Sequence, residues 1–174
     1  TMSNALIFAA TDDNRSFAFA AALMPELPEV EVTRMGLSAP LTGARIEAVY
    51  MGKPLRWPLG CKPESLLQQT VGAVQRRGKY LWLSLERGGL LLHLGMSGSL
   101  AFSGSLPAPG PHDHFDLLTT QGGLRLTDPR RFGRIRLVPG DVTASPPISE
   151  LGFDPLLDMP DEATFSSRFA KRGG

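Results

Sequence analysis

The apolar and polar positions after residue 43 predict a protein built mainly of short β-strands. Residues 79–86 place a leucine at every second position, and residues 134–138 alternate in the same way. Residues 90–94 are instead an apolar run interrupted only by His93, which is typical of a strand buried on both faces. Shorter patterned stretches predict further strands at residues 44–51, 100–103, 115–120 and 124–127.

Residues 28–38 (PEVEVTRMGLS) predict a helix. Proline suits a first helical turn, and early glutamates complement the positive end of the helix dipole. Val30, Thr33 and Leu37 would then form one stripe along the helix. A helical turn is expected at residues 66–69 and a final helix at residues 161–172.

Many short strands joined by glycine-rich turns favour an antiparallel sandwich or barrel. The fold class that we predict is therefore mainly β with flanking helices, in the form of an antiparallel β-sandwich. Residues 103–111 (SGSLPAPGP) predict a flexible loop, and residues 139–147 a proline-rich connection. No internal repeat is visible.

The first 23 residues do not match the pattern of the rest. A secretory signal would open with basic residues and continue with an unbroken apolar stretch, but polar residues 12–15 interrupt this segment. We interpret residues 1–23 as an extension outside the native domain, either translated upstream sequence or a disordered tail. Residues 24–148 would form the β-sandwich domain, and residues 149–174 the start of a connection to a further half.

Composition and charge narrow the function only slightly. The 174 residues carry a net charge of +1, which by itself does not indicate nucleic-acid binding. Cationic residues nevertheless cluster at 76–79, 125–136 and 168–172, although such clusters are often only solvated surface. The single cysteine, Cys61, excludes a disulfide within the chain and a multi-cysteine zinc site. No apolar run reaches the length of a transmembrane helix.

Four stretches carry candidate chemistry, and each alone is a weak signal. They are PELPEVE at 25–31, QRRGKYL at 75–81, HLGMSGSL at 93–100 and TDPRRFG at 127–133. Together and in this order they resemble the formamidopyrimidine-DNA glycosylases that act on 8-oxoguanine. The resemblance runs from Met24 to about Arg172 and covers roughly the first half of a family member. The opening PELPE resembles this group, whereas the related endonuclease VIII group usually opens with PEGPE.

The resemblance implies base-excision DNA repair. Such an enzyme hydrolyses the N-glycosidic bond of oxidised purines (8-oxoguanine and formamidopyrimidines) and cleaves the resulting abasic site by Schiff-base elimination. The family's nucleophile is an N-terminal proline, here Pro25, because a terminal amine has a pKa of about 7.7–8.0 and is partly neutral at physiological pH. An amide nitrogen cannot attack, so we expect Met24 to be the true start and to be removed.

The same resemblance assigns roles around the nucleophile. Glu26 would be the acid–base residue at the sugar, or alternatively only a first-turn helix glutamate. Glu29 would be mainly structural. Lys79 would contact the lesion phosphate or assist elimination, or alternatively be a solvated lysine at a strand end. Arg76 and Arg77 would only add to the positive field.

Further residues would contact the DNA. A flipped-out base leaves a gap that side chains on loop tips can fill. The resemblance assigns this role to Met96, Arg130 and Phe132, with Arg130 also contacting the opposite base and favouring cytosine. Ordinary core packing is the alternative for Met96 and Phe132. His112 and Arg172 match DNA contacts of the family; a metal site at His112 and His114 is disfavoured because no third ligand is evident.

The expected partner is double-stranded DNA with oxidised purines or abasic sites, bound by a monomer in the bacterial cytoplasm, with no membrane association. Family members continue into a helix-two-turn-helix segment and a four-cysteine zinc finger. We expect these, with the structural zinc, to lie outside this chain, which needs no cofactor of its own. Two alternatives remain: a non-catalytic damaged-DNA-binding fragment in which Pro25 is internal, and an unrelated β-domain that binds protein partners.

Overall fold

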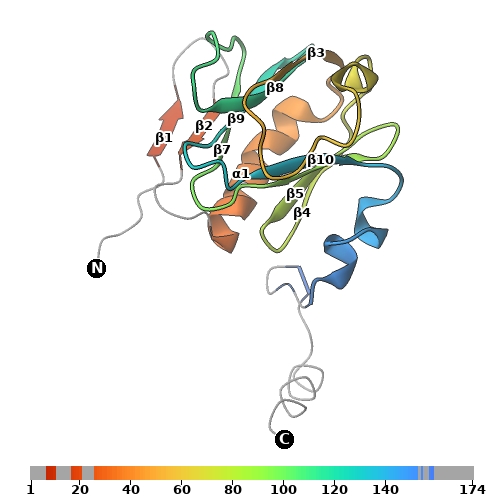
Figure 1. The fold of residues 1–174 in the computed structure, drawn as a ribbon. Coiled ribbons are helices and arrows are strands. Elements are labelled where there is room, and N and C mark those ends of the chain that lie inside the picture. Colours follow the sequence, from red (N-terminus) through yellow and green to blue (C-terminus); the bar gives the residue numbers. More distant parts are fainter. Residues whose placement is uncertain (1–6, 11–16, 21–25, 153, 155–156, 159–174) are drawn as a thin grey trace, which may run out of the picture.

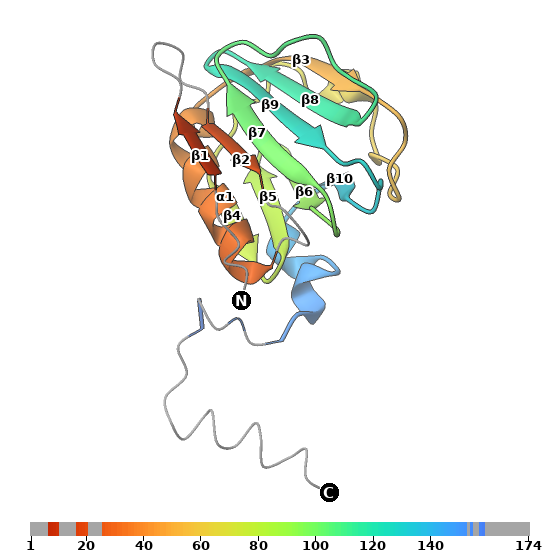
Figure 2. The same ribbon diagram turned by 90° about the vertical axis from the view of Figure 1, so that its left-hand side faces the viewer.

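A computed structural model describes residues 7–10, 17–20, 26–152, 154, 157 and 158. Two antiparallel sheets pack face to face with one helix along their side (Figures 1 and 2). One sheet has the order β1 (Ile7–Ala10), β2 (Phe17–Ala20), β7 (Ser99–Ser103), β9 (Gly122–Thr127), β8 (Asp113–Thr119), β3 (Ile46–Met51). The other has the order β10 (Arg134–Val138), β6 (Gly89–His93), β5 (Tyr80–Ser84), β4 (Val74–Arg77). The predicted fold class, an antiparallel β-sandwich, is confirmed.

The predicted N-terminal helix is confirmed and is longer than the pattern indicated. Helix α1 spans Leu27–Leu41 and buries Val30, Thr33, Leu37 and Leu41. Its last turn contains Pro40, which the prediction excluded by stopping at residue 38. The helix packs against β4 and β5 and so lies along the edge of the four-stranded sheet (Figure 2).

The predicted strands are all present, but one strand of the four-stranded sheet was missed. The segment Val74–Arg77 forms β4, whose burial alternates with Val74 and Arg76 inward. An arginine in an inward position breaks the apolar alternation on which the prediction depended. The helical turn expected at residues 66–69 was misplaced: a 3₁₀ turn, η1, spans Pro63–Leu66. The helix expected at residues 161–172 lies outside the described residues.

Two strands come from the first 23 residues. Strands β1 and β2 form a hairpin, and β2 pairs with β7 through Phe17 opposite Phe102 and Ala18 opposite Ala101. They extend the edge of the six-stranded sheet (Figure 2). The disordered-tail interpretation is therefore wrong for residues 7–10 and 17–20.

The four-stranded sheet is covered on both faces. Leu90 and Leu92 of β6 lie in the main core between the sheets, whereas Leu91 packs in a second cluster. That cluster includes Trp82 of β5 and Val142 and Ile148 of two 3₁₀ turns, η2 (Val142–Ala144) and η3 (Ile148–Glu150). The prediction that residues 90–94 are buried on both faces is confirmed. In the part of the chain that the structure describes, no helix is long and apolar enough to span a bilayer.

Candidate active site and nucleic-acid interface

Four of the residues with predicted chemistry line one cavity of about 440 Å³. The cavity lies where α1 begins, where the β4–β5 turn ends and where the loops after β6 and before β10 meet. Its lining residues are Glu26, Arg56, Lys79, His93, Gly95, Met96, Phe132 and Arg134. A larger hollow of about 650 Å³ lies along β4 and residues 143–151 and contains none of the predicted site residues. Chemistry, rather than size, therefore identifies the smaller cavity as the candidate site.

Glu26 and Lys79 form an ion pair at this cavity. Glu26 precedes the first turn of α1, and its Oε2 lies 2.7 Å from Nζ of Lys79. Lys79 belongs to the two-residue turn between β4 and β5, which the pair Arg77–Tyr80 closes. Both side chains are about half exposed, at 43% for Lys79 and 56% for Glu26, so a substrate can reach both. Pro25 lies outside the described residues.

His93 adds a neutral hydrogen-bond donor to the cavity. Burial, and then the positive charges of Arg134 and Lys79, lower the pKa of His93 to about 4, so the imidazole is neutral at pH 7. Its Nδ1 accepts a hydrogen bond from the Gly95 amide at 3.0 Å. In a neutral imidazole the other nitrogen, Nε2, then carries the proton. His93 can therefore donate to a phosphate or sugar oxygen without carrying charge.

The lowered pKa of His93 predicts a sensitivity of the fold to acid. Between pH 6.5 and about 4 the unfolded chain binds a proton at His93 that the folded protein does not. Protonation of His93 therefore does not affect the free energy of unfolding above pH 6.5. As the pH falls from 6.5 toward 4, it lowers the free energy of unfolding. We expect the melting temperature of His93→Gln to depend less on pH over this window than that of the wild type. Thermal unfolding followed by circular dichroism measures this, and identical pH profiles would contradict it.

Asp128 holds together the two loops that carry the predicted gap-filling residues. It is fully buried, and its carboxylate accepts hydrogen bonds from Ser97 Oγ at 2.5 Å, the Arg130 amide at 3.2 Å and the Gly133 amide at 2.6 Å. Ser97 directly follows Met96. One buried carboxylate thus fixes the Met96 loop and the Arg130–Phe132 loop relative to each other.

The Met96 loop also requires glycine at its closest approach. Gly95 has a φ of +64°, and a Cβ added there would lie 2.6 Å from the carbonyl carbon of Phe132. The glycine therefore lets the two loops touch backbone to backbone. Met96 itself is 39% exposed, and Phe132 is partly buried. Packing in the main core, the alternative for these two residues, does not occur.

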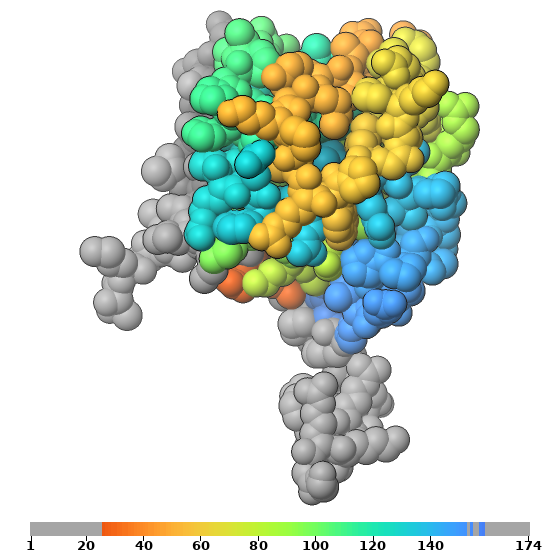
Figure 3. Space-filling view, in the orientation of Figure 1, coloured from red at the N-terminus to blue at the C-terminus, as the bar shows by residue number. Residues whose placement is uncertain are grey.

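Two guanidinium groups contact the ring of Phe132. The Arg56 Cζ lies 4.4 Å from the ring centroid and the Arg130 Cζ lies 5.0 Å from it. Arg56 belongs to the loop after β3, which lies against the loop before β10 on the surface (gold against cyan in Figure 3). These cation–π contacts hold the Phe132 ring and the two positively charged guanidinium groups together at the edge of the cavity.

The remaining predicted contacts lie in different places. His112 is exposed, and its carbonyl accepts the Asp128 amide at 2.8 Å, which places it beside the Arg130 loop but outside the cavity lining. His114 is buried between the carbonyls of Lys53 and Asp128. Arg172 lies outside the described residues. Among the described residues, no cluster of three or more histidine, cysteine, aspartate or glutamate side chains could hold a metal ion.

Two arginines of the cationic clusters are structural. Arg125 is 7% exposed and forms a bidentate pair with Asp116, with distances of 2.8 and 2.7 Å. Arg76 is 3% exposed and pairs with Glu31 and Asp154. The expectation that Arg76 adds to the positive surface field is wrong, because its charge is buried and compensated.

Three polar residues of the cavity were missed from the sequence: Arg56, His93 and Arg134. His93 is part of the HLGMSGSL stretch, where only the methionine was singled out. Arg134 alternates with Ile135 in a predicted strand, which placed it on a surface but not beside a cavity. Arg56 follows a strand that is distant in sequence, and no local pattern indicates that it reaches Phe132.

Comparisons with known proteins agree with this arrangement. The family model described as the formamidopyrimidine-DNA glycosylase N-terminal domain matches residues 24–135. The formamidopyrimidine-DNA glycosylase of Polaromonas naphthalenivorans is 56% identical over 144 residues, which cover 82% of this chain and 53% of the relative. That of Variovorax paradoxus is 56% identical over 151 residues, covering 86% and 56%. The chain thus spans about half the length of the curated relatives it matches.

Solved structures show the same fold. The complex of Lactococcus lactis Fpg with DNA containing an abasic site has a TM-score of 0.59 and 32% identity, covering 66% of this chain and 44% of that one. The complex of the wild-type L. lactis protein with DNA containing N7-benzyl-Fapy-dG gives the same values. The matched family model, the sequence identity and the shared fold together show that this chain belongs to the formamidopyrimidine-DNA glycosylase family.

Proposed function

We propose that the protein containing this chain excises oxidised purines from double-stranded DNA and cleaves the resulting abasic site. The observation that carries the proposal is that Glu26, Lys79 and His93 share one cavity with Met96 and Phe132. Groups suited to proton transfer and phosphate contact thus lie beside side chains suited to filling a gap in a base stack. The family membership and the DNA complexes of L. lactis Fpg support the same substrate.

The proposed nucleophile is the amine of Pro25, next to Glu26 in the chain. Its nitrogen lone pair attacks C1′ of the damaged nucleotide, and the bond from C1′ to the base breaks. The base leaves with the bonding electrons and takes up a proton, while the opened sugar forms an iminium with the amine. Loss of the C2′ proton then expels the 3′ phosphate. Glu26 is suited to transfer protons at the sugar, and the mechanism requires Pro25 to be the N-terminal residue.

The remaining cavity residues are suited to hold the strand. Lys79, Arg56 and Arg134 provide positive charge for phosphates, and His93 offers its Nε2 proton. Met96, Arg130 and Phe132 would enter the duplex where the base has left, and His112 and Arg172 would contact the backbone. The structural zinc of the family would bind outside this chain, and the protein would act as a monomer in the bacterial cytoplasm.

The proposal is tested with the full-length protein that begins at Pro25 and a duplex that contains one 8-oxoguanine opposite cytosine. We expect release of the free base and strand cleavage at that position, with no reaction of the undamaged duplex of the same sequence. Tight, selective binding of the damaged duplex without base release would instead support a non-catalytic damage-binding role. Equal treatment of damaged and undamaged DNA would contradict the proposal.

A further inference from the structure

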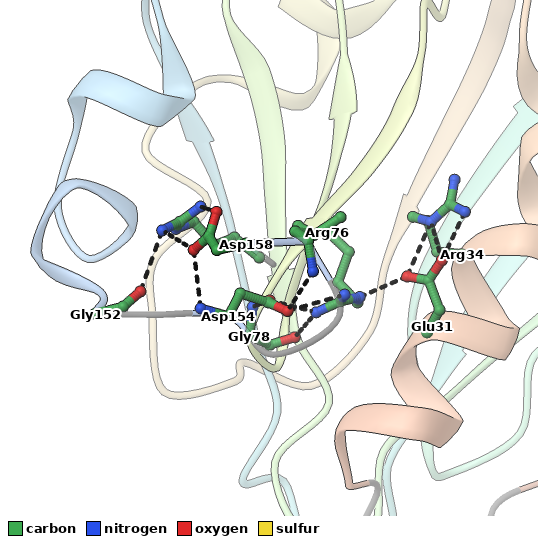
Figure 4. A network of polar contacts seen from close by, with 9 residues as sticks. Glu31, Arg34, Arg76, Gly78, Gly152, Asp154 and Asp158 are labelled. Carbon is green, nitrogen blue, oxygen red and sulfur yellow. Dashed lines mark hydrogen bonds and ion pairs between the residues drawn. The ribbon is translucent and has the colours of Figure 1, made fainter. Parts of the chain in front are cut away.

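A buried ionic network lies behind the turn that carries Lys79. Its centre is Arg76, whose side chain is fully buried between two carboxylates (Figure 4). The Nε atom donates to Glu31 of α1, and Nη1 donates to Asp154 Oδ2 at 2.7 Å. The Asp154 side chain is 1% exposed and belongs to the segment that follows the last strand. Three segments that are distant in sequence thus meet at one guanidinium group.

The network forms hydrogen bonds with both peptide groups of Gly78, the residue before Lys79. The Gly78 amide donates to Asp154 Oδ2 at 2.6 Å, and the Gly78 carbonyl accepts from Arg76 Nη1 at 3.0 Å. The peptide that enters Gly78 and the peptide that joins it to Lys79 are therefore each fixed by a buried charged side chain. Gly78 has a φ of +56°, so the turn adopts a backbone conformation that few other residues accept.

The same network reaches the helix that carries the partner of Lys79. Glu31 lies in the first turns of α1, which begins directly after Glu26. Arg34 also donates to Glu31, at 2.7 Å, and holds that carboxylate in place (Figure 4). The hydrogen bonds from Arg34 and Arg76 lower the pKa of Glu31, so its carboxylate stays charged. Arg76 thus connects the backbone of Lys79 to the helix start that positions Glu26.

We propose that Arg76 and Asp154 are positioning residues, which orient the Lys79 turn so that the Lys79 ammonium meets Glu26 and the substrate. This inference rests on the proposed function for its catalytic consequence, but its structural part stands on the contacts of Gly78. It implies that residues beyond the matched family model, which ends at residue 135, complete the site. Asp154 would act through the backbone of the turn and need not touch DNA.

The charge-assisted hydrogen bonds explain why this arrangement is suited to positioning. Hydrogen bonds to ionised groups are shorter and stronger than neutral ones, and a buried charge that loses its partner is strongly unfavourable. The turn therefore cannot rotate either peptide of Gly78 without leaving Arg76 or Asp154 without one of its partners. A displacement of about 1 Å at a catalytic group can lower a rate by about 10²-fold.

The test uses three variants of the full-length protein: Asp154→Asn, Arg76→Lys and the control Asp141→Asn. Asp154→Asn removes the charge with little change in shape, and Arg76→Lys keeps the charge but loses the guanidinium geometry. Asp141 is a fully exposed carboxylate that caps η2 away from the cavity. All measurements are made at a temperature at which circular dichroism shows every variant to be folded.

The first readout needs no activity. We expect faster hydrogen exchange of the Gly78 amide and a shifted Lys79 ammonium resonance in Asp154→Asn and Arg76→Lys, with Asp141→Asn unchanged. The second readout is cleavage of a duplex with a preformed abasic site, for which we expect kcat to fall about tenfold or more with KM nearly unchanged.

The two readouts separate the inference from the proposed function. An inactive wild type would overturn the proposed function, while the Gly78 and Lys79 signals would still decide the positioning role. Unchanged Gly78 exchange and Lys79 resonance in both variants would overturn the positioning role, and so would wild-type kcat in variants of an active enzyme.

Discussion

Replacing Lys79 by methionine in the full-length protein should lower the rate of damaged-base removal by about 10²-fold or more. The change keeps the length of the side chain but removes the ammonium group, which lies 2.7 Å from Glu26. A positioned proton-transfer group contributes about 10²–10⁴-fold to a rate, and Glu26 would lose the charge that orients it. Single-turnover cleavage of an 8-oxoguanine duplex measures the effect directly.

Lys62→Met is the matched control for this prediction. Lys62 is exposed at the start of η1, outside the cavity lining, so its loss should leave the rate within about twofold. Both variants should unfold close to the wild-type temperature, because exposed substitutions usually change stability by less than about 0.5 kcal/mol. A Lys79→Met rate equal to that of Lys62→Met would show that the ammonium group is a solvated charge without a role in the reaction.

The largest effect on stability is expected for Arg125→Met. Arg125 and Asp116 face each other on neighbouring strands β9 and β8, with side chains only 9% and 6% exposed. Removing one partner of a buried pair leaves the other charge uncompensated, which costs about 3–5 kcal/mol. Urea unfolding should therefore show a decrease of this size in the free energy of unfolding.

Two further variants make this expectation specific. Arg45→Met changes an exposed arginine and should alter stability by less than about 0.5 kcal/mol. The double variant Arg125→Met with Asp116→Leu should be more stable than Arg125→Met alone, because the buried Asp116 charge is removed with its partner. Asp113, which also pairs with Arg125, keeps its hydrogen bonds from Thr127 and the Gly110 amide. A double variant that is less stable than the single one would show that Arg125 acts mainly through packing.

The strands were predictable because most of them obey simple patterns. Residues 134–138 alternate, and their predicted bounds agree with β10. Strand β4 does not obey the pattern, because Arg76 occupies an inward position that is apolar in an ordinary strand. Its burial is stabilised by Glu31 and Asp154, which lie 45 and 78 residues away. No local pattern contains that compensation.

The candidate site was predictable only in part, for a related reason. The motifs named Glu26, Lys79, Met96 and Phe132, and the structure brings these four together. Arg56 could not be placed, because its contact with Phe132 joins two loops that are far apart in the sequence. The position of Asp128 in the TDPRRFG stretch was visible, but its bond to Ser97 depends on the folded arrangement of two loops.

The chemistry of Pro25 is the central step of the proposed function, and borohydride trapping tests it directly. Two forms of the full-length protein are compared, one that begins at Pro25 and one that retains residues 1–24 before it. Each is incubated with an abasic-site duplex and borohydride, and the covalent product is digested and sequenced by mass spectrometry. We predict a protein–DNA product only for the form with a free Pro25 amine, with the DNA attached at Pro25. An equal yield from both forms, or attachment at Lys79, would contradict the account.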